Sequence, residues 1–441
     1  MDNNFDTNFY NDLSDYIDNV DYSSYTLQYP PPFILENKFN NKDFLDWFKF
    51  TQKKVWIYIH IPFCDTKCTF CRYYSIIDFK LDTYFKYVNY LIKELEIYKK
   101  VLDTNNILID TIYIWWGTPS ILDEVSLEKL LNYIFLNINL DDSYQFCFEA
   151  NPNSLSIKKI KILKKYNCNR LTLWIQSLDS NVLEKINRVQ SKKDVIRSIY
   201  YWKKIWIEYI NVDLMLWIKW QTYKSFINDV KIVSWLKPDM IHLHPYTSTW
   251  RVIDNKNFTS IRDVKMKMEK NWTLYLKSKW YWDIEWDALW FNNNSKNKQL
   301  FNALNWWEYI WIGVSSVWYN SLFRTINTDS LNNYYSFLDK WALPVKFWSL
   351  LTKEDNMIQY IIYNIRYNEI SIGKFNSIFW VDILKYFKEV FLLLKEKWIL
   401  DIINNKIIFY FKTPYEYSVF SKYFYSKEIL LKSKKLIYEN K

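Results

Sequence analysis

The stretch His60-Ile-Pro-Phe-Cys64-Asp-Thr-Lys-Cys68-Thr-Phe-Cys71 follows a short apolar run and places three cysteines within eight residues. Cysteine thiolates hold iron–sulfur clusters, and a [4Fe-4S] cluster takes four ligands, so three clustered cysteines leave one iron open to chemistry. The alternatives are a zinc site and three buried thiols. Structural zinc usually takes two separated pairs of ligands, and the remaining candidates form no such pair: Cys147, Cys168, His242 and His244. The spacing therefore favours an iron–sulfur cluster.

The stretch from Tyr58 to Cys71 resembles the cluster motif of radical S-adenosylmethionine (SAM) enzymes, and the branch it most resembles is oxygen-independent coproporphyrinogen III oxidase. The resemblance extends by eye to near residue 400. Further matching stretches follow in order: Thr118-Pro119, Glu149-Ala-Asn-Pro152, Arg170-Leu-Thr-Leu-Trp-Ile-Gln-Ser177, Asn187-Arg188-Val-Gln190 and Asp213-Leu-Met-Leu-Trp-Ile-Lys-Trp-Gln-Thr222. The resemblance implies that the open iron binds the amino and carboxylate groups of SAM. An electron from the cluster then breaks a C–S bond to give a 5′-deoxyadenosyl radical.

The resemblance also assigns residues to the site. Cys64, Cys68 and Cys71 are the expected cluster ligands and thus the catalytic residues. The residues expected to contact SAM are Tyr58, Phe70, Trp116, Gly117, Thr118, Glu149, Gln176, Arg188 and Asp213. Carboxylates suit an ammonium group and ribose hydroxyls, and arginine suits a carboxylate. Taken singly, each polar residue fits a strand end or the surface equally well, and the two aromatic residues fit a core.

Tryptophan stands where the family has glycine. Trp115-Trp116-Gly117 replaces three successive glycines, and the same pattern fits Trp174, Trp217, Trp220, Trp56, Trp206, Trp280, Trp311, Trp341 and Trp398. The chain has 24 Trp and only 3 Gly, which together make about 6% of its 441 residues, near the glycine content of ~7% in ordinary proteins. Glycine serves where φ is positive or where backbone approaches a ligand closely. We hypothesise that the source organism reads the codon UGA as glycine and that the printed sequence translates it as tryptophan.

Other histidines and cysteines carry weaker signals. His242 and His244 alternate on a predicted strand and so point to the same face. Two such histidines can bind a metal, but with no third ligand in view the sequence favours structural polar residues. Cys147 and Cys168 are expected to be buried thiols.

The pattern of the chain predicts an α/β fold with three parts. An extended arm over 1–50 contains Pro30-Pro31-Pro32, a radical SAM core covers 51–290, and a helix-rich, substrate-covering domain covers 291–441. In the last part, Leu351-Thr-Lys-Glu-Asp355 resembles a capped helix start and Asn404-Asn405 a turn between two strands. In the core, helical segments separate six β-rich runs, which predicts a parallel sheet. The runs cover 55–61, 111–114, 144–150, 170–175, 209–215 and 240–244. The resemblance makes this sheet a partial, six-stranded (β/α)6 barrel with cluster and SAM at the C-terminal strand ends.

Composition limits the cellular location and the kind of partner that we expect. The chain contains no apolar run of 18 residues, and its N-terminus is acidic and Asn-rich, so we expect neither a membrane span nor a secretory signal. Five cysteines, three of them clustered, fit the reducing cytoplasm. The net charge of +10 is spread over scattered lysines, which favours a basic surface over a nucleic-acid site and suits an anionic substrate. The expected state is a monomer.

The resemblance implies a function, with alternatives. The first is oxidative decarboxylation of two propionates of coproporphyrinogen III to vinyl groups, with a flavodoxin or ferredoxin as electron donor. The long N-terminal arm, Asn187-Arg188-Val-Gln190 and Gly313-Val-Ser-Ser316 favour it. Against it, Tyr73 stands where the oxidase has a fourth cysteine, and Asp287-Ala288 where it has Asp-His. The alternatives are a heme-binding chaperone of the same superfamily and a radical SAM heme-degrading methyltransferase.

Overall fold

The computed structural model describes residues 29–31, 50–71, 73–77, 80–205, 207–218, 220–246, 271–285, 288–290, 308–411 and 420–432. The chain divides into two compact units. One consists of Met1–Glu36, Leu322–Arg324 and Ser349–Lys441, and the other of Asn37–Ser321 and Thr325–Trp348. Most of the predicted arm over 1–50 lies outside the described residues, as do Trp206 and Asp287. The three-part division expected from the sequence stays a prediction.

Six parallel strands form the centre of the larger unit, in the order β1-β4-β5-β6-β7-β8. Their order in space is their order in the chain, so each connection returns to the neighbouring position, as right-handed βαβ crossovers do. The predicted α/β fold with six successive parallel strands is thereby confirmed. The strands are β1 (Lys54–Ile61), β4 (Leu108–Gly117), β5 (Leu140–Ala150), β6 (Arg170–Gln176), β7 (Tyr209–Leu216) and β8 (Met240–Pro245).

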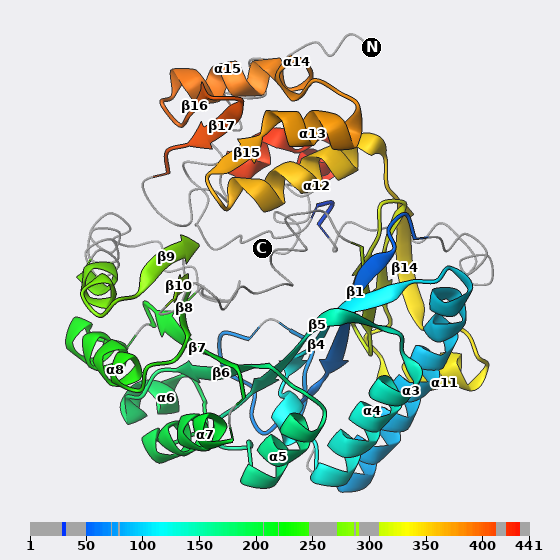
Figure 1. The fold of residues 1–441 in the computed structure, drawn as a ribbon, viewed down its shortest axis with the longest axis vertical. Helices are drawn as coiled ribbons and strands as arrows, with labels where there is room; N and C mark the ends of the chain where they lie inside the picture. The colour runs from blue at the N-terminus through cyan, green and yellow to red at the C-terminus, as the bar shows by residue number, and fades with distance from the viewer. Residues whose placement is uncertain are drawn as a thin grey trace. The chain divides into compact units, whose positions relative to one another are not determined.

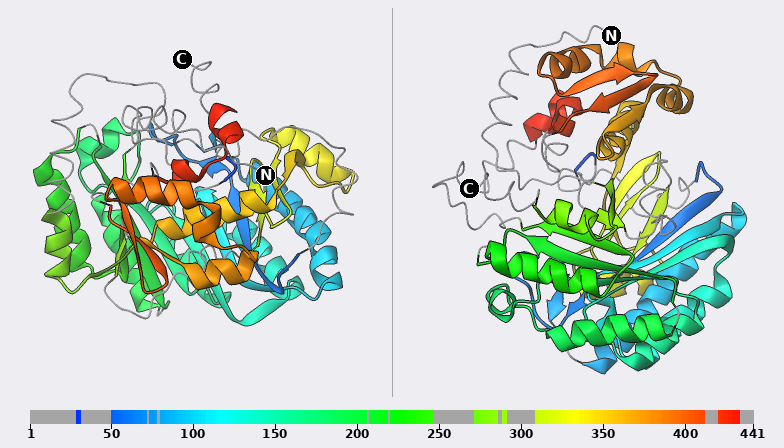
Figure 2. Two further views of the ribbon diagram at one scale, coloured as in Figure 1. Left: turned by 90° about the horizontal axis from the view of Figure 1, so that it is seen from above. Right: turned by 60° about the vertical axis from the view of Figure 1, so that its left-hand side comes forward.

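Helices follow the strands and cover one side of the sheet (Figure 1; Figure 2). They are α3 (Leu81–Thr104), α4 (Glu124–Asn137), α5 (Ile157–Lys165), α6 (Ser180–Lys185), α7 (Lys192–Lys204) and α8 (Tyr223–Trp235). Strand β1 reads Val-Trp-Ile-Tyr-Ile-His-Ile after its first residue, and all seven of these side chains are buried. Such a continuous apolar run is typical of parallel strands that are covered on both faces.

Capping side chains fix where several of these helices begin. Asp123, Ser156 and Asp179 accept hydrogen bonds from backbone amides in the first turns of α4, α5 and α6. Ser191 and Thr222 form complete capping boxes at α7 and α8. Each cap satisfies amides that the helix itself leaves unpaired. These caps thus fix the end of each connecting loop at the residue where the next helix begins.

Further strands extend the sheet to twelve within the described residues. On the β8 edge stand β10 (Ala288–Trp290) and β9 (Trp282–Glu285), paired antiparallel. Beyond β1 stand β11 (Tyr309–Ile312), parallel to it, then β12 (Val317–Tyr319), β13 (Phe323–Asn327) and β14 (Val345–Leu350). Helix α11 (Leu331–Asp339) lies between β13 and β14 in the chain. The short strands β2 (Phe63–Cys64) and β3 (Ile76–Ile77) pair separately.

The smaller unit is helix-rich and contains a small antiparallel sheet. Thr352 and Asp355 form the capping box of α12 (Lys353–Ile365), and Asn404-Asn405 turns between β16 (Leu400–Ile403) and β17 (Lys406–Phe409), as predicted. The other elements are β15 (Glu369–Ser371), α13 (Ile372–Phe379), α14 (Ile383–Tyr386), α15 (Lys388–Glu396) and η3 (Ser421–Phe424). None of the helices in the described part of the chain is long and apolar enough to span a membrane.

A buried carboxylate joins α3 to the β11 side of the sheet. Glu94 accepts hydrogen bonds from the Gly313 amide at 2.9 Å, the Asn327 side-chain amide at 2.9 Å and the Tyr334 hydroxyl at 2.5 Å. These three donors bring together segments that are more than two hundred residues apart in the chain. Burial raises the pKa of Glu94 to about 7, against its ordinary 4.5.

This raised pKa predicts a pH-dependent stability. Between pH 4.5 and about 7 the folded protein holds a proton on Glu94 that the unfolded chain has released, so stability falls as pH rises through that window. Replacing Glu94 with Gln removes this loss. Between about pH 5 and about pH 8, the parent therefore loses on the order of 3 kcal/mol more of its free energy of unfolding than Glu94→Gln does. Urea unfolding at both pH values measures the difference, with Glu96→Gln on the same helix as control. Parallel pH profiles for parent and Glu94→Gln would contradict the assignment.

Backbone φ angles test whether glycine suits the positions where the sequence has tryptophan. Six described tryptophans have left-handed backbone, with φ between 53° and 67°: Trp116, Trp217, Trp280, Trp341, Trp380 and Trp398. A left-handed conformation costs an ordinary L-residue about 1–2 kcal/mol and costs glycine almost nothing. Trp380 occupies the left-handed cap of α13 and is 89% exposed, so its indole gains little from packing. Glycine is the usual residue at such helix ends.

The other suspected positions that the structure describes are not in this left-handed group: Trp56, Trp115, Trp174, Trp220 and Trp311. For them the glycine hypothesis depends on the family pattern and on side-chain crowding, described below. Backbone conformation thus supports part of the set. The identity of these residues in the natural protein stays a prediction.

Peptide masses of the protein isolated from its source test the hypothesis. We expect glycine mass at 115 and 116 in the peptide that covers 111–125, and likewise at 380 and 398. Trp202, which is buried inside α7, is the internal comparison, since it lies at a helical position where glycine is disfavoured. Tryptophan mass at 115 and 116 would refute the reassignment.

Candidate functional site at the C-terminal strand ends

The cysteine loop follows β1 and is held against the segment between α6 and α7. The Thr69 amide donates to the Ile186 carbonyl at 3.1 Å, and the Thr66 hydroxyl donates to the Asn187 carbonyl at 2.9 Å. In return the Asn187 side-chain amide donates to the Lys67 carbonyl at 3.0 Å. Asn187 itself has φ of 55°, which asparagine tolerates better than most residues. These bonds fix the loop at the mouth of the sheet.

Hydrogen bonds connect two of the three cysteines through a chain of three side chains. The Thr118 hydroxyl lies 3.5 Å from the Cys64 sulfur and accepts from the Asn151 amide at 3.1 Å. The Asn151 carbonyl oxygen accepts from Arg188 Nη2 at 2.8 Å, and Arg188 Nη1 lies 3.8 Å from the Cys68 sulfur. We call Thr118, Asn151 and Arg188 the relay. Thr118 follows β4, Asn151 follows β5, and Arg188 lies between α6 and α7, so the relay joins two strand-end loops to the α6–α7 segment.

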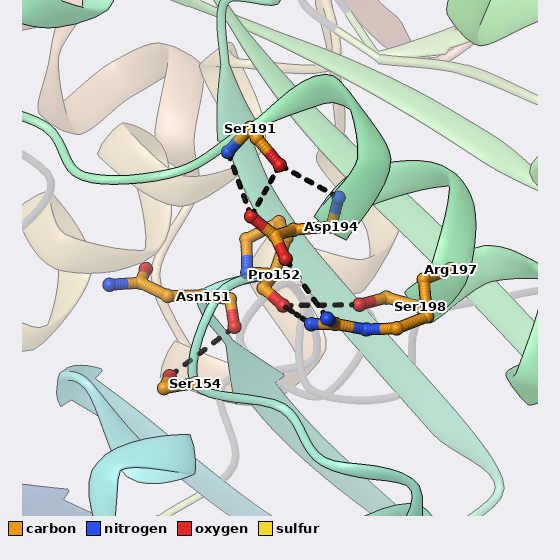
Figure 3. Close-up of polar contacts among 7 residues, drawn as sticks. All are labelled: Asn151, Pro152, Ser154, Ser191, Asp194, Arg197 and Ser198. Carbon is orange, nitrogen blue, oxygen red and sulfur yellow. Dashed lines mark hydrogen bonds and ion pairs between the residues drawn. The ribbon is translucent and has the colours of Figure 1, made fainter.

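Helix α7 holds the turn that carries Asn151 (Figure 3). The Pro152 carbonyl accepts from Arg197 Nη2 at 3.1 Å and from the Ser198 hydroxyl at 3.3 Å. Arg197 also pairs with Asp194 at 3.0 Å, and Asp194 closes the capping box with Ser191. Arg197 and Ser198 in the middle of α7 therefore fix the backbone beside Asn151, whose side chain binds Arg188. The sequence supplied the Glu149-Ala-Asn-Pro152 match but no reason to assign Asn151 to the site.

Burial sets the protonation of the cysteines. It raises the pKa of Cys64 to about 11 and also raises the pKa of Cys71, while the charge of Arg188 opposes both shifts. The sulfurs of Cys68 and Cys71 act electrostatically on Cys64, so the three thiols share one region. A bound metal deprotonates such thiols because it supplies the missing positive charge. Cys147 and Cys168 are buried thiols, as expected.

Acceptors without full partners lie at the ends of β5 and β6. The Tyr113 hydroxyl donates to Glu149 Oε1 at 2.6 Å, whereas Glu149 Oε2 has no hydrogen bond of normal geometry to a described residue. Burial and the neighbouring charge of Asp213 raise the pKa of Glu149 well above its ordinary value. Gln176 is buried with φ of 61°, and its Oε1 is likewise unbonded within the described residues. Buried acceptors of this kind need a donor.

The two aromatic candidates have different surroundings. Tyr58 is fully buried in β1, and its hydroxyl donates to the Trp115 carbonyl at 3.0 Å. Phe70 is partly buried against an apolar cluster and lies 6.3 Å from the ring of Tyr246. The cluster consists of Val182, Leu183, Ile186, Met215 and Ile218. Tyr58 thus lies in the core and Phe70 at its margin, and their contacts with SAM stay predictions.

Indole rings occupy the space beside these residues. The Trp116 ring stacks on Tyr73 at 4.0 Å and lies 5.5 Å from the Tyr58 ring. Trp311 lies 4.4 Å from Tyr58, and Trp174 lies beside the Glu149 carboxylate. Gly117 has φ of 57°, and a Cβ built there would meet the Ile61 carbonyl oxygen at 1.8 Å, so only glycine fits that position. With glycine at 116, 174 and 311, the indoles beside Tyr58 and Glu149 would be absent.

The structure also supplies the third polar group that the sequence did not show beside His242 and His244. Asp213 on β7 pairs in register with His242 on β8. His242 Nδ1 lies 3.8 Å from Asp213 Oδ1, and His244 Nε2 lies 3.4 Å from Asp213 Oδ2. The parallel pairing of β7 with β8 creates this proximity, and only the register reveals it.

Comparisons with known proteins place the chain in a family. Residues 58–232 match the radical SAM superfamily. The heme chaperone HemW of Buchnera aphidicola (subsp. Acyrthosiphon pisum) is 30% identical over 298 residues, 65% of this chain and 77% of that protein. The oxygen-independent coproporphyrinogen III oxidase of Helicobacter pylori is 27% identical over 354 residues, 76% of this chain and 77% of that protein. Among solved structures, coproporphyrinogen III oxidase HemN of Escherichia coli matches with a TM-score of 0.80 at 18% identity, over 91% of this chain and 96% of that one.

The fold and the matched segment define a radical SAM protein. Within that superfamily the chain belongs to the family that includes the oxygen-independent coproporphyrinogen III oxidases and the heme chaperones HemW. The family and the barrel fold predicted from the sequence are both confirmed.

Asn151 is predicted to position Arg188 and Thr118. Asn151→Ala leaves a buried guanidinium and a hydroxyl short of partners, at a cost of about 2 kcal/mol in the free energy of unfolding. Asn151→Asp keeps the acceptor for Arg188 and loses only the donor to Thr118, so its loss in the free energy of unfolding is less than half of that in Asn151→Ala. Urea unfolding measures both. The control is Asn153→Ala, which removes a single bond to Asp65 outside the relay. Equal stability of Asn151→Ala and Asn153→Ala would contradict the relay.

Proposed function

We propose that the protein is a radical SAM oxidoreductase that converts two propionates of coproporphyrinogen III to vinyl groups. The observation that carries the proposal is the relay: its two ends donate to two of the three motif cysteines, at the C-terminal ends of parallel strands. In barrel-like sheets of this kind the active site forms at that end. Each propionate loses a hydrogen atom from its β-carbon, carbon dioxide and one further electron, which passes to an acceptor.

Cys64, Cys68 and Cys71 would hold a [4Fe-4S] cluster. The three thiols share one region, and their spacing in the chain favours an iron–sulfur cluster over a single zinc ion. When bound, the cluster and SAM supply the one-electron chemistry that starts hydrogen abstraction.

The strand-end polar groups would hold SAM. Glu149 Oε2 and Gln176 Oε1 offer buried acceptors that suit an ammonium group or ribose hydroxyls. Arg188 is a donor for a carboxylate, and its guanidinium is already oriented by Gln190 and Asn151 at 3.0 and 2.8 Å. Gly117 has no Cβ, which lets the end of β4 lie against the Ile61 carbonyl beside the cysteine loop. This part of the proposal includes glycine at 115, 116 and 174, which removes the indoles beside these groups.

The choice of substrate draws on the relatives and on charge. The alignment with the H. pylori oxidase spans 76% of this chain, against 65% for the Buchnera chaperone. A net charge of +10 favours a substrate with four propionates. We expect a reduced flavodoxin or ferredoxin as electron donor, and a monomeric protein in the cytoplasm.

A heme chaperone is the second candidate, because the 30% identity to the Buchnera heme chaperone HemW exceeds the 27% to the H. pylori oxidase. A chaperone would bind heme and leave its propionates intact. The two functions therefore differ in one measurable product.

The deciding experiment uses protein with glycine at the suspected tryptophans, reconstituted anaerobically with iron and sulfide. Reductant, SAM and coproporphyrinogen III are added, and tetrapyrroles are followed by mass. We expect loss of two carbon dioxide units with matching 5′-deoxyadenosine. Intact substrate with tight heme binding would assign the chaperone function instead, and methylated, ring-opened heme would assign the heme-degrading methyltransferase.

Cysteine variants are the controls. Replacing Cys64, Cys68 and Cys71 with Ser abolishes the visible absorption of the cluster and all SAM cleavage. Replacing the buried pair Cys147 and Cys168 with Ala leaves both, because neither lies in the motif. Cluster absorption that survives the first substitution would refute the assigned ligands.

A further inference from the structure

The side chains of Asp213, His242 and His244 form a compact group that the cysteine site does not use. One ligand atom from each lies within 4.8 Å of the other two, and no other group of three such residues in the described part of the chain is this compact. The two imidazole rings lie 4.0 Å apart at an angle of 56°. All three side chains come from the adjacent strands β7 and β8, so rigid backbone sets their spacing.

The distances match those around one small ion. A tetrahedral ion with bonds of about 2.0–2.1 Å to nitrogen and oxygen separates its ligand atoms by roughly 3.3 Å. His244 Nε2 lies 3.4 Å from Asp213 Oδ2, and His242 Nδ1 lies 3.8 Å from Asp213 Oδ1. One ligand atom from each of the three side chains lies within 4.8 Å of the other two, so the group closes around an ion when the side chains move toward one another. The histidine side chains are 39% and 20% exposed, and the aspartate is 8% exposed, so an ion can enter from the histidine side.

The local charge favours a cation. The buried carboxylate of Glu149 interacts electrostatically with Asp213, so two acidic groups share this end of the sheet. Neutral imidazoles add ligand atoms without adding charge.

We propose that Asp213, His242 and His244 bind a divalent transition-metal ion of the zinc class, separately from the cysteine motif. Two imidazoles and a carboxylate are a ligand set that zinc and its neighbours accept, and three protein ligands leave one position open. A consequence depends on the proposed function: if Asp213 also contacts SAM, the metal and SAM compete for it.

Binding is tested with Co2+ as the probe, on the full chain carrying the residues that peptide masses find at the suspected positions. Cys64, Cys68 and Cys71 are replaced with Ser so that the motif thiols do not contribute, and Cys147 and Cys168 remain as buried thiols. We expect one Co2+ per chain, with visible bands but no thiolate charge-transfer band, displaced by Zn2+. His242→Ala and His244→Ala each weaken binding at least about tenfold. The control His60→Gln, which removes the third histidine of the chain, retains it. The proposed site is refuted if the double variant His242→Ala/His244→Ala binds Co2+ as well as the parent does. It is also refuted if the parent binds no Co2+.

Competition is tested on the reconstituted enzyme by SAM cleavage at increasing Zn2+. We expect inhibition that SAM relieves, and weaker inhibition in His244→Ala, because it lacks one metal ligand and keeps Asp213. If Co2+ binds as expected but SAM does not relieve inhibition, the metal site stands and the role of Asp213 toward SAM fails. If SAM cleavage is absent altogether, the proposed function fails, and the Co2+ measurement still decides the metal site.

Discussion

The hydrogen-bonded relay of Thr118, Asn151 and Arg188 is the constraint on which the rest of the site depends. Two members come from the loops after β4 and β5 and the third from the segment between α6 and α7, and the two ends of the relay contact Cys64 and Cys68. The cysteine loop contains no long helix or strand of its own to hold it. Its position is therefore set by its neighbours: the relay on one side and the bonds to Asn187 on the other. Helix α7 fixes the relay in turn, through the Pro152 carbonyl.

Much of the fold was predictable because its signals are local. Six β-rich runs separated by helical segments specify parallel strands in chain order, and the structure has that order. Cys64, Cys68 and Cys71 were predicted as cluster ligands from their spacing, and the structure brings the three thiols into one region. The contacts of Asn151 were not predictable, because they join segments far apart in the chain, and neither was the group of Asp213 with His242 and His244, because strand register brings it together. Asp213 and His242 are 29 residues apart in the chain and directly paired in the sheet. The buried contact of Glu94 with Tyr334 spans 240 residues and leaves no pattern in the sequence.

At the suspected tryptophans, the backbone conformation and the surroundings of the indole give two separate tests of whether glycine fits. At Trp380 and Trp398 the chain adopts a left-handed turn while the indoles are almost fully exposed. A large apolar residue gains nothing there and bears a conformational cost, whereas glycine bears none. At Trp116 the same backbone conformation coincides with an indole stacked into the site region. Backbone and site thus point to one cause, because glycine meets the φ requirement and clears the space beside Tyr58 together.

The polar groups at the C-terminal ends of β5, β6 and β7 suit two proposed ligands, SAM and a metal ion. Glu149, Gln176 and Asp213 lie on β5, β6 and β7, and the first two have acceptor atoms without partners among the described residues. These acceptors suit the ammonium and hydroxyl groups of SAM, and Asp213 alone also faces two imidazoles on β8. If Asp213 serves both the proposed metal ion and a ribose hydroxyl of SAM, occupancy by one ligand lowers affinity for the other, because a carboxylate oxygen cannot fully satisfy both at once. On that proposal, His242 and His244 would couple metal availability to SAM binding.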